Sequence, residues 1–138
     1  MTSLIGTVLR MMVKDTTPPK VKRFIIVGES ADSLTLASVY INTELNMKVN
    51  YNLDLQCQHI EFQAAGRDYL DHTSFVDCSK LKIVERAELC TIIKNRPAVV
   101  IGRLDPQDFE VVRRQITCST TIKGKIKKRY GFYDSASH

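Results

Sequence analysis

The chain has 138 residues, of which 43% are hydrophobic and 25% are charged, and its formal net charge is +5. This length and composition are typical of a single soluble globular domain. No apolar run approaches the ~20 residues of a membrane-spanning helix, and the N-terminus lacks the pattern of a secretory signal, so no membrane contact is expected.

Apolar runs and alternating patterns predict five to seven short strands in the early and middle parts of the chain. The candidate strands are residues 6–13, 22–27, 34–41, 59–62, 74–78, 81–84 and 99–101. Within 34–41 the even-numbered side chains are expected on one face and the odd-numbered ones on the other, and both faces are partly apolar. This pattern favours a strand inside a small curved sheet.

Proline, glycine and asparagine predict the connections between these strands. Pro18 and Pro19 remove two backbone donors, so residues 15–20 are expected to form a loop. Residues 28–33 are expected to form a turn. The asparagine-rich segment 42–58 is expected to be a long loop with at most a brief turn of helix.

Two short helices are predicted to follow the strands. Residues 85–93 can form the first, which ends before Pro97 because the residue preceding a proline avoids the helical region. Asp105 and Pro106 suit the N-cap and first position of a second helix, and apolar residues from Phe109 to Ile116 recur at helical spacing. Residues 117–138 are expected to begin as a strand or turn and to end as a partly flexible basic tail.

These elements predict a mainly β fold with peripheral short helices. Short strands without alternating long helices favour a small barrel over a doubly wound sheet. The barrel and its helices are expected to form one domain over residues 1–116, followed by the basic tail at 117–138.

Charge is distributed unevenly along the sequence. Residues 10–23 contain five basic residues and one acid, residues 24–62 contain five acids and one base, and residues 111–133 contain seven bases and no acid. Two basic ends that meet in space would form a cationic surface, which attracts phosphate groups through a salt-dependent force. The alternative is that these lysines and arginines only keep the surface solvated.

The cysteines and histidines do not form a metal-binding or disulfide pattern. The cysteines are far apart, without a C-x-x-C pair, at Cys57, Cys78, Cys90 and Cys118. Free thiols in a reducing, cytoplasmic compartment are therefore expected. His59, His72 and His138 are predicted to be structural or surface residues, and neither a metal nor another cofactor is expected. Nucleotide-binding and hydrolase signatures are absent from the sequence.

Several short motifs resemble the MazF/PemK family of endoribonuclease toxins. The motifs of the C-terminal half are His59-Ile60-Glu61-Phe62, Ser74-Phe75-Val76-Asp77, Leu81-Lys82-Ile83-Val84 and Ile101-Gly102-Arg103-Leu104. In the N-terminal half, residues 6–9 resemble the first strand of the family and residues 22–27 its Arg-Pro-apolar strand. The resemblance covers residues 6–116.

This resemblance implies an SH3-like barrel with peripheral helices, assembled as a homodimer. It also implies metal-independent cleavage of single-stranded RNA within a toxin–antitoxin system. In such a reaction the RNA 2′-hydroxyl attacks the neighbouring phosphate, a cation stabilises the growing charge, and a positioned group transfers a proton. The implied inhibitor is an antitoxin with an acidic, partly disordered peptide segment.

The resemblance also implies candidate site residues. Arg23 corresponds to the family's catalytic Arg and would stabilise the phosphate, with Lys22 as the competing cation. Tyr40 aligns with the family's catalytic Thr, and Ser38 shares its face of the strand, so either would handle the proton. The residues expected to bind the RNA are Arg10, Lys14, Thr16, Thr17, Lys20 and Lys22.

A second hypothesis is a non-catalytic SH3-like module that binds nucleic acid or a protein partner. Phe24 stands where the family has Pro after its catalytic Arg, and Tyr40 is bulkier than Thr. This hypothesis predicts salt-sensitive nucleic-acid binding without turnover. Charge reversal in the basic tail is then expected to weaken binding, at Lys125, Lys127 and Lys128.

Overall fold

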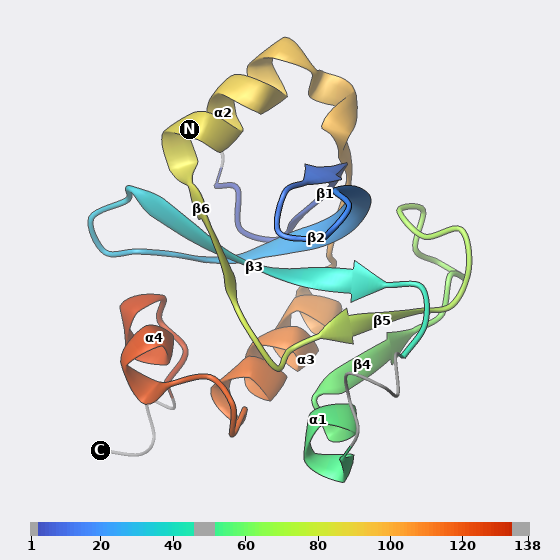
Figure 1. Ribbon diagram of the computed structural model, residues 1–138, viewed down its shortest axis with the longest axis vertical. Helices are drawn as coiled ribbons and strands as arrows, with labels where there is room; N and C mark the ends of the chain where they lie inside the picture. The colour runs from blue at the N-terminus through green and yellow to red at the C-terminus, as the bar shows by residue number, and fades with distance from the viewer. Residues whose placement is uncertain (1–2, 46–51, 134–138) are drawn as a thin grey trace.

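A curled antiparallel sheet forms a half-barrel in the computed structural model, which describes residues 3–45 and 52–133 (Figure 1). In this part of the chain the strands are β1 Thr7–Val13, β2 Lys20–Glu29, β3 Thr35–Asn42, β4 His59–Phe62, β5 Ser74–Asp77, β6 Lys82–Glu85 and β7 Val100–Arg103. The helices are α1 Leu53–Cys57, α2 Arg86–Asn95, α3 Pro106–Thr117 and α4 Gly124–Arg129, with a 3-10 turn at Pro97–Val99. The prediction of a mainly β fold with peripheral short helices is confirmed.

Strand β3 is the centre of the sheet because it has partners along both edges. The strand order is β4-β5-β3-β2-β1-β7, and β6 also pairs with β3. Strand β5 pairs with the end of β3 at Ile41 and Asn42, whereas β6 pairs with its beginning, where Lys82 lies opposite Ser38. Strands β5 and β6 thus pair with different parts of the same edge of β3. The pairing of Lys82 with Ser38 brings β6 close to the site described below.

Both faces of the sheet are buried, and each packs against a different helix. On one face Val8, Ile25 and Val39 join a core that includes Val112 and Ile116 of α3. On the other face the core contains Leu9, Phe24, Ile26 and Leu36, together with Leu89 of α2. Figure 1 shows α2 and α3 on opposite sides of the strands. The predicted alternation within residues 34–41 is therefore confirmed from Leu36 onward, while Leu34 is exposed.

Helix α3 begins at the predicted cap. The Asp105 side chain accepts a hydrogen bond from the backbone N–H of Asp108 at 2.7 Å, and Pro106 occupies the first turn. Asp108 in turn forms an ion pair with Arg67, whose Nε lies 2.9 Å from the carboxylate. Val112 and Ile116 are completely buried, as expected for the apolar face of this helix.

The segment that follows α3 differs from the prediction of a strand or turn. Residues 124–129 form α4, and Ile122, Tyr130 and Phe132 are buried in the same core as α3. Gly28 of β2 permits this close approach, because a Cβ at that position would lie 3.0 Å from the Tyr130 carbonyl oxygen. Residues 117–133 thus contribute to the core that α3 also contacts. The expected flexible end, residues 134–138, lies outside the described residues.

The predicted long loop at 42–58 contains a capped helical turn. The side chain of Asn52 accepts a hydrogen bond from the backbone N–H of Leu55 at 2.9 Å, which begins the five-residue helix α1. Residues 46–51 of the predicted loop lie outside the described residues. None of the helices in the described ranges has the length and apolar character needed to cross a membrane.

Candidate nucleic-acid interface

Four lysines gather where the start of β2 meets the connection between β5 and β6. This lysine cluster consists of Lys20, Lys22, Lys80 and Lys82. Lys22 is half-buried and its Nζ donates a hydrogen bond to Asn42 Oδ1 at 2.9 Å. Burial lowers the pKa of Lys22, and repulsion from Lys20 and Lys80 lowers it further. The charges of Asp15 and Asp77 act in the opposite direction but do not outweigh these effects. Neighbouring positive charges of this kind favour binding of an anion.

Tyr40 of β3 lies beside the lysine cluster, and its ring is on the same face of the sheet as Lys22 and Lys82. The Nζ atoms of Lys82 and Lys22 lie 5.4 and 5.9 Å from the centre of its ring. Both distances are within the range of a cation–π contact. The other edge of the ring packs against Phe24 with ring centres 6.4 Å apart, which is expected because Phe24 lies opposite Tyr40 in the β2–β3 register.

Asp15 connects the tyrosine and the lysines. The Tyr40 hydroxyl donates a hydrogen bond to Asp15 Oδ1 at 2.6 Å, and Lys82 Nζ lies 2.7 Å from Asp15 Oδ2. Partial burial, the hydrogen bond to Asp15 and the charge of that carboxylate all raise the pKa of Tyr40 above its ordinary value. Burial acts to raise the pKa of Asp15, but the hydrogen bonds from Lys82 and Tyr40 outweigh it and lower that pKa. At neutral pH the site therefore holds a phenol and a carboxylate.

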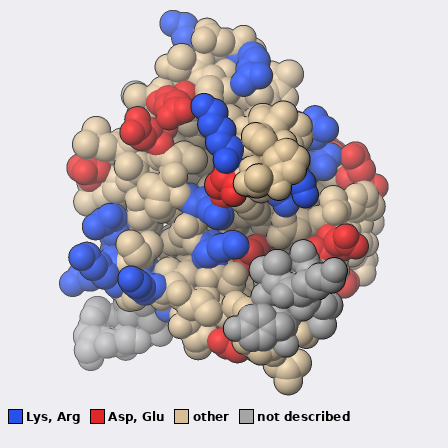
Figure 2. Space-filling model, viewed as in Figure 1, with Lys and Arg blue, Asp and Glu red and all other residues tan. Residues whose placement is uncertain are grey.

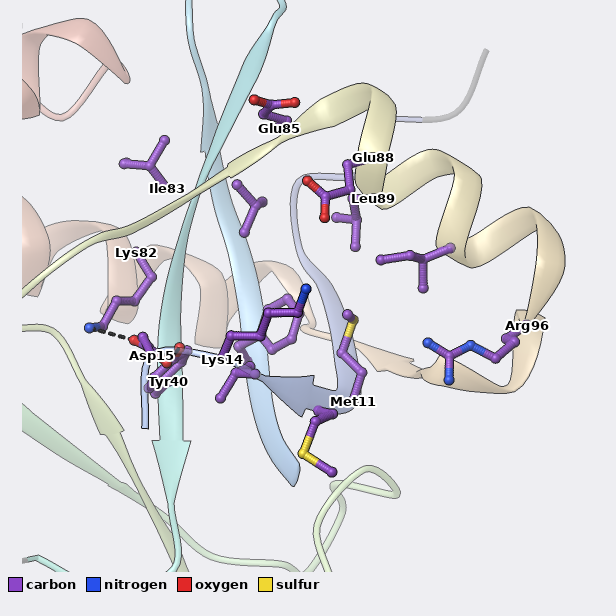
Figure 3. Close-up of a pocket in the computed structure, with 15 residues that line it drawn as sticks. Met11, Lys14, Asp15, Tyr40, Lys82, Ile83, Glu85, Glu88, Leu89 and Arg96 are labelled. Carbon is purple, nitrogen blue, oxygen red and sulfur yellow. Dashed lines mark hydrogen bonds and ion pairs between the residues drawn. The ribbon is translucent and has the colours of Figure 1, made fainter. Parts of the chain in front are cut away.

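A hollow of about 830 Å³ adjoins this site, between α2 and the strands β1, β2, β3 and β6. Its apolar lining includes Phe24, Leu89 and Ile92. Figure 3 shows Lys14, Lys82 and Arg96 around its edge, with Glu85 and Glu88 on the side of α2. Tyr40, Asp15 and Lys82 also line the hollow, and its charged lining contains both signs. The other three lysines of the cluster do not line it.

Arg23 and Tyr40, the predicted catalytic pair, lie on opposite faces of the sheet. Consecutive residues of a strand point to opposite faces, and Lys22 is the residue on the Tyr40 face. Arg23 lies opposite Ile41 and Arg10 in the sheet register, and its Nη2 donates to Asp71 at 2.8 Å. The competing cation of the sequence analysis, Lys22, thus occupies the position expected for Arg23.

Ser38 is also unsuited to the predicted proton transfer. It shares the Tyr40 face, but its side chain is buried with the residue 1% exposed, and its hydroxyl donates to the Lys82 carbonyl oxygen at 2.9 Å. This bond fixes β6 on β3 and leaves the hydroxyl out of reach of a ligand. The contact of the Ser38 hydroxyl with the β6 backbone is therefore a structural one.

The residues predicted to bind RNA are dispersed. Lys20 and Lys22 belong to the lysine cluster, and Lys14 lies at the edge of the hollow. Arg10 is exposed on the face of Arg23. In the loop between β1 and β2, Thr17 is exposed, while the hydroxyl of Thr16 donates to the Pro18 carbonyl oxygen at 2.9 Å.

Sequence reasoning missed Lys80, Lys82 and Asp15 as site residues. Lys80 and Lys82 are two residues apart, and this close spacing of two basic residues is the local signal that could have identified them as a pair. Lys80 precedes β6, so strand alternation does not determine where its side chain lies. The position of Lys82 beside Tyr40, however, depends on the pairing of β6 with β3, which joins residues 44 positions apart.

The C-terminal basic segment forms a separate group of charges. Figure 2 shows lysine and arginine side chains gathered over the region of α4 and others across the middle of the same face. Lys125, Lys128 and Arg129 are exposed. Lys127 differs from them, because its Nζ donates to the carbonyl oxygens of Thr117 and Ser119 at 2.9 and 2.5 Å. Charge reversal at Lys127 would therefore disturb the C-terminal end of α3 as well as the surface charge.

His59 has the structural role that was predicted. Its side chain is 2% exposed, with Nδ1 2.9 Å from the Leu55 carbonyl oxygen and Nε2 3.5 Å from Asp77 Oδ1. His72 is exposed, and His138 lies outside the described residues. The cysteines Cys57, Cys78, Cys90 and Cys118 are free thiols. Over residues 3–45 and 52–133, no group of three or more potential ligands is arranged to hold a metal ion.

The site is better arranged to hold a phosphate than to transfer protons. The Tyr40 hydroxyl and the Lys82 ammonium group contact one carboxylate, and a second ammonium group, from Lys22, lies near the Tyr40 ring. Such donors suit phosphate oxygens. A general acid–base pair works best when its pKa values lie near the operating pH. The raised pKa of Tyr40 and the lowered pKa of Asp15 lie on either side of that range.

No model of a known protein family matches the chain, and no curated protein sequence matches it either.

Proposed function

We propose that this protein binds single-stranded RNA through Tyr40 and the lysine cluster. The observation that carries the proposal is the placement of two lysine ammonium groups, from Lys22 and Lys82, at 5.9 and 5.4 Å from the centre of the Tyr40 ring. Proteins that bind single-stranded nucleic acids commonly place an aromatic ring among basic side chains. The bases stack on the ring, and the basic side chains bind the phosphate backbone.

The half-buried position of Tyr40 supports a role in recognition. Its hydroxyl and ring are fixed by Asp15 and Phe24, so little conformational freedom remains to be lost when a base stacks on the exposed surface. Single-stranded RNA is favoured over a duplex because stacking on a side chain requires an unpaired base. The resemblance to the MazF/PemK toxins independently favours RNA as the ligand. The same resemblance favours an SH3-like fold for the half-barrel.

Binding is tested by the salt dependence of affinity for a labelled, mixed-sequence RNA oligonucleotide. We expect Lys22→Ala and Lys82→Ala each to weaken binding and to reduce the slope of log K against log salt concentration by roughly 0.7, the value for one phosphate contact on a single strand. Fluorescence anisotropy at several salt concentrations measures both quantities. Lys94→Ala is the control, since Lys94 is exposed on α2 and does not line the hollow. Equal losses in all three variants would contradict the proposal.

Metal-independent RNA cleavage is the second candidate function. The specific observation in its favour is that the Tyr40 hydroxyl faces the same position as Lys82, with Lys22 as the second cation. Incubation with RNA in EDTA, followed by mapping of the ends, tests it. Cleavage that is abolished by Tyr40→Phe and Lys22→Ala but retained in Arg23→Ala would establish this reaction. Intact RNA at saturating protein would leave binding alone.

The remaining partners belong to the same proposal. An acidic peptide segment, as implied by the MazF/PemK resemblance, would compete with RNA for the lysine cluster. A homodimer in the cytoplasm is the expected setting, and sedimentation equilibrium measures the oligomeric state. A monomer at all concentrations would contradict that part of the proposal while leaving the RNA site in place.

A further inference from the structure

The Asp15 carboxylate takes up two donors of the candidate site, the Tyr40 hydroxyl and the Lys82 ammonium group. The carboxylate receives one donor on each oxygen, with Tyr40 Oη at 2.6 Å from Oδ1 and Lys82 Nζ at 2.7 Å from Oδ2. A phosphate group offers its oxygens to ammonium and hydroxyl donors in the same way. A phosphate could not take both donors while the carboxylate stays in place.

The carboxylate is held by a segment that is itself accessible. Asp15 lies in the connection between β1, which ends at Val13, and β2, which begins at Lys20. The side chains of Asp15 and Lys82 are 38% and 31% exposed. Ion pairs with this degree of exposure contribute little to stability, so replacing the carboxylate by another anion costs little free energy.

We propose that Asp15 is an internal anion that competes with RNA phosphate for Lys82 and the Tyr40 hydroxyl, and that a ligand must displace it to bind. This inference rests on the proposed RNA function, whose regulation it describes. The negative charge of Asp15 also repels a phosphate that approaches the lysine cluster. Displacement would free Lys82 and Tyr40 together, and it would move the segment that bears Lys14 at the edge of the hollow.

The proposal predicts that Asp15→Asn raises affinity for phosphate. The amide preserves the size of the side chain but removes its charge and one of its two acceptor oxygens, so an added anion competes more easily for the two donors. We expect inorganic phosphate to bind at least fivefold more tightly to Asp15→Asn than to the unaltered protein. The chemical shifts of Tyr40 and Lys82 in an NMR titration measure this affinity. The RNA oligonucleotide is expected to show a gain of similar size by anisotropy.

Asp71→Asn is the matched control. Asp71 also pairs with a cation, Arg23, but on the opposite face of β2, and its side chain is 79% exposed. Its loss is expected to leave phosphate binding at Tyr40 and Lys82 unchanged. Asp15→Ala serves as a second variant, and circular dichroism confirms that each variant is folded.

The outcomes separate this inference from the RNA function. Tighter phosphate binding by Asp15→Asn without any RNA binding would support the internal anion and overturn the RNA function. Equal RNA and phosphate affinities in the unaltered protein and both Asp15 variants would retain the RNA function and overturn the internal anion. A gain in Asp71→Asn as large as that in Asp15→Asn would also overturn it, because a general reduction of negative charge would then explain both.

Discussion

At the scale of single residues, the candidate site depends on the two-residue repeat of a strand. Lys22 and Arg23 are neighbours in the sequence, yet Lys22 contacts the Tyr40 ring and Arg23 pairs with Asp71 on the opposite face. If a motif alignment is shifted by one residue, it therefore assigns Arg23 to the site in place of Lys22. The sequence analysis identified both cations, and the register of β2 against β3 chose between them.

Tyr40 also predicts how stability changes at alkaline pH. Its pKa is raised in the folded protein by burial and by Asp15, so the folded state holds the phenolic proton more tightly than the unfolded chain does. The resulting stabilisation is complete below the unfolded tyrosine pKa of about 10 and is lost as pH rises above it. We expect the urea midpoint to stay nearly constant up to about pH 9.5, to fall as pH rises from about 10 to about 11.5, and to fall less in Tyr40→Phe.

Tyr133→Phe is the control for this titration, since Tyr133 is exposed. Part of the alkaline loss should persist in Tyr40→Phe because burial raises the pKa of Tyr69 to about 12 as well. An identical fall of the midpoint in Tyr40→Phe and the unaltered protein would show that the hydroxyl of Tyr40 does not titrate as the contact with Asp15 implies.

At the scale of elements, the Ile-Gly-x-Leu motif has a packing explanation. Gly102 of β7 lies opposite Val8 of β1, and the ring of Tyr69 rests directly on it. A Cβ at Gly102 would lie 2.9 Å from Tyr69 Cδ1. The motif therefore joins the edge strand β7 to the loop between β4 and β5, and its glycine is required by this close approach rather than by its backbone conformation.

Gly102→Ala is accordingly expected to destabilise the protein by about 1–3 kcal/mol, the usual cost of overpacking a close contact. Urea denaturation measures the change. Gly124→Ala is the matched control, because nothing lies within 4 Å of a Cβ at this first position of α4. There the same substitution is expected to be neutral or to stabilise by up to ~1 kcal/mol. A loss at Gly124 equal to that at Gly102 would refute the packing explanation.

At the scale of the whole molecule, two cores on opposite faces of one sheet hold the chain together. The larger core extends from the strands through α3 to the end of the described chain, where Tyr130 and Phe132 are buried. The boundary predicted at residue 116 is the last apolar residue of the predicted second helix. The basic residues of 117–133 lie mainly on the surface, while a few apolar residues between them reach the core.

Phe132→Ala is expected to destabilise the protein by about 3–5 kcal/mol, as for other fully buried aromatic residues. Tyr133→Ala changes the adjacent residue, which is exposed, and should shift stability by less than ~0.5 kcal/mol. Thermal or urea unfolding of both variants measures the difference. Equal stability of the two variants would show that the C-terminal segment is a tail after all.

The sequence by itself determined the features that depend on neighbouring residues. These are the alternation within residues 34–41, the cap of α3 at Asp105, the break before Pro97 and the predominance of strands. Each follows from the backbone preference or side-chain spacing of residues within a few positions of one another.

Only the tertiary structure decided which charged groups meet. Lys82 reaches Tyr40 through a strand pairing across 44 positions, and Asp15 reaches both from the loop of a different hairpin. It also decided that Arg23 faces away from Tyr40 and that Phe132 enters the core. Such contacts depend on strand order, register and curvature, which arise from packing of the whole chain and have no signature in a local pattern.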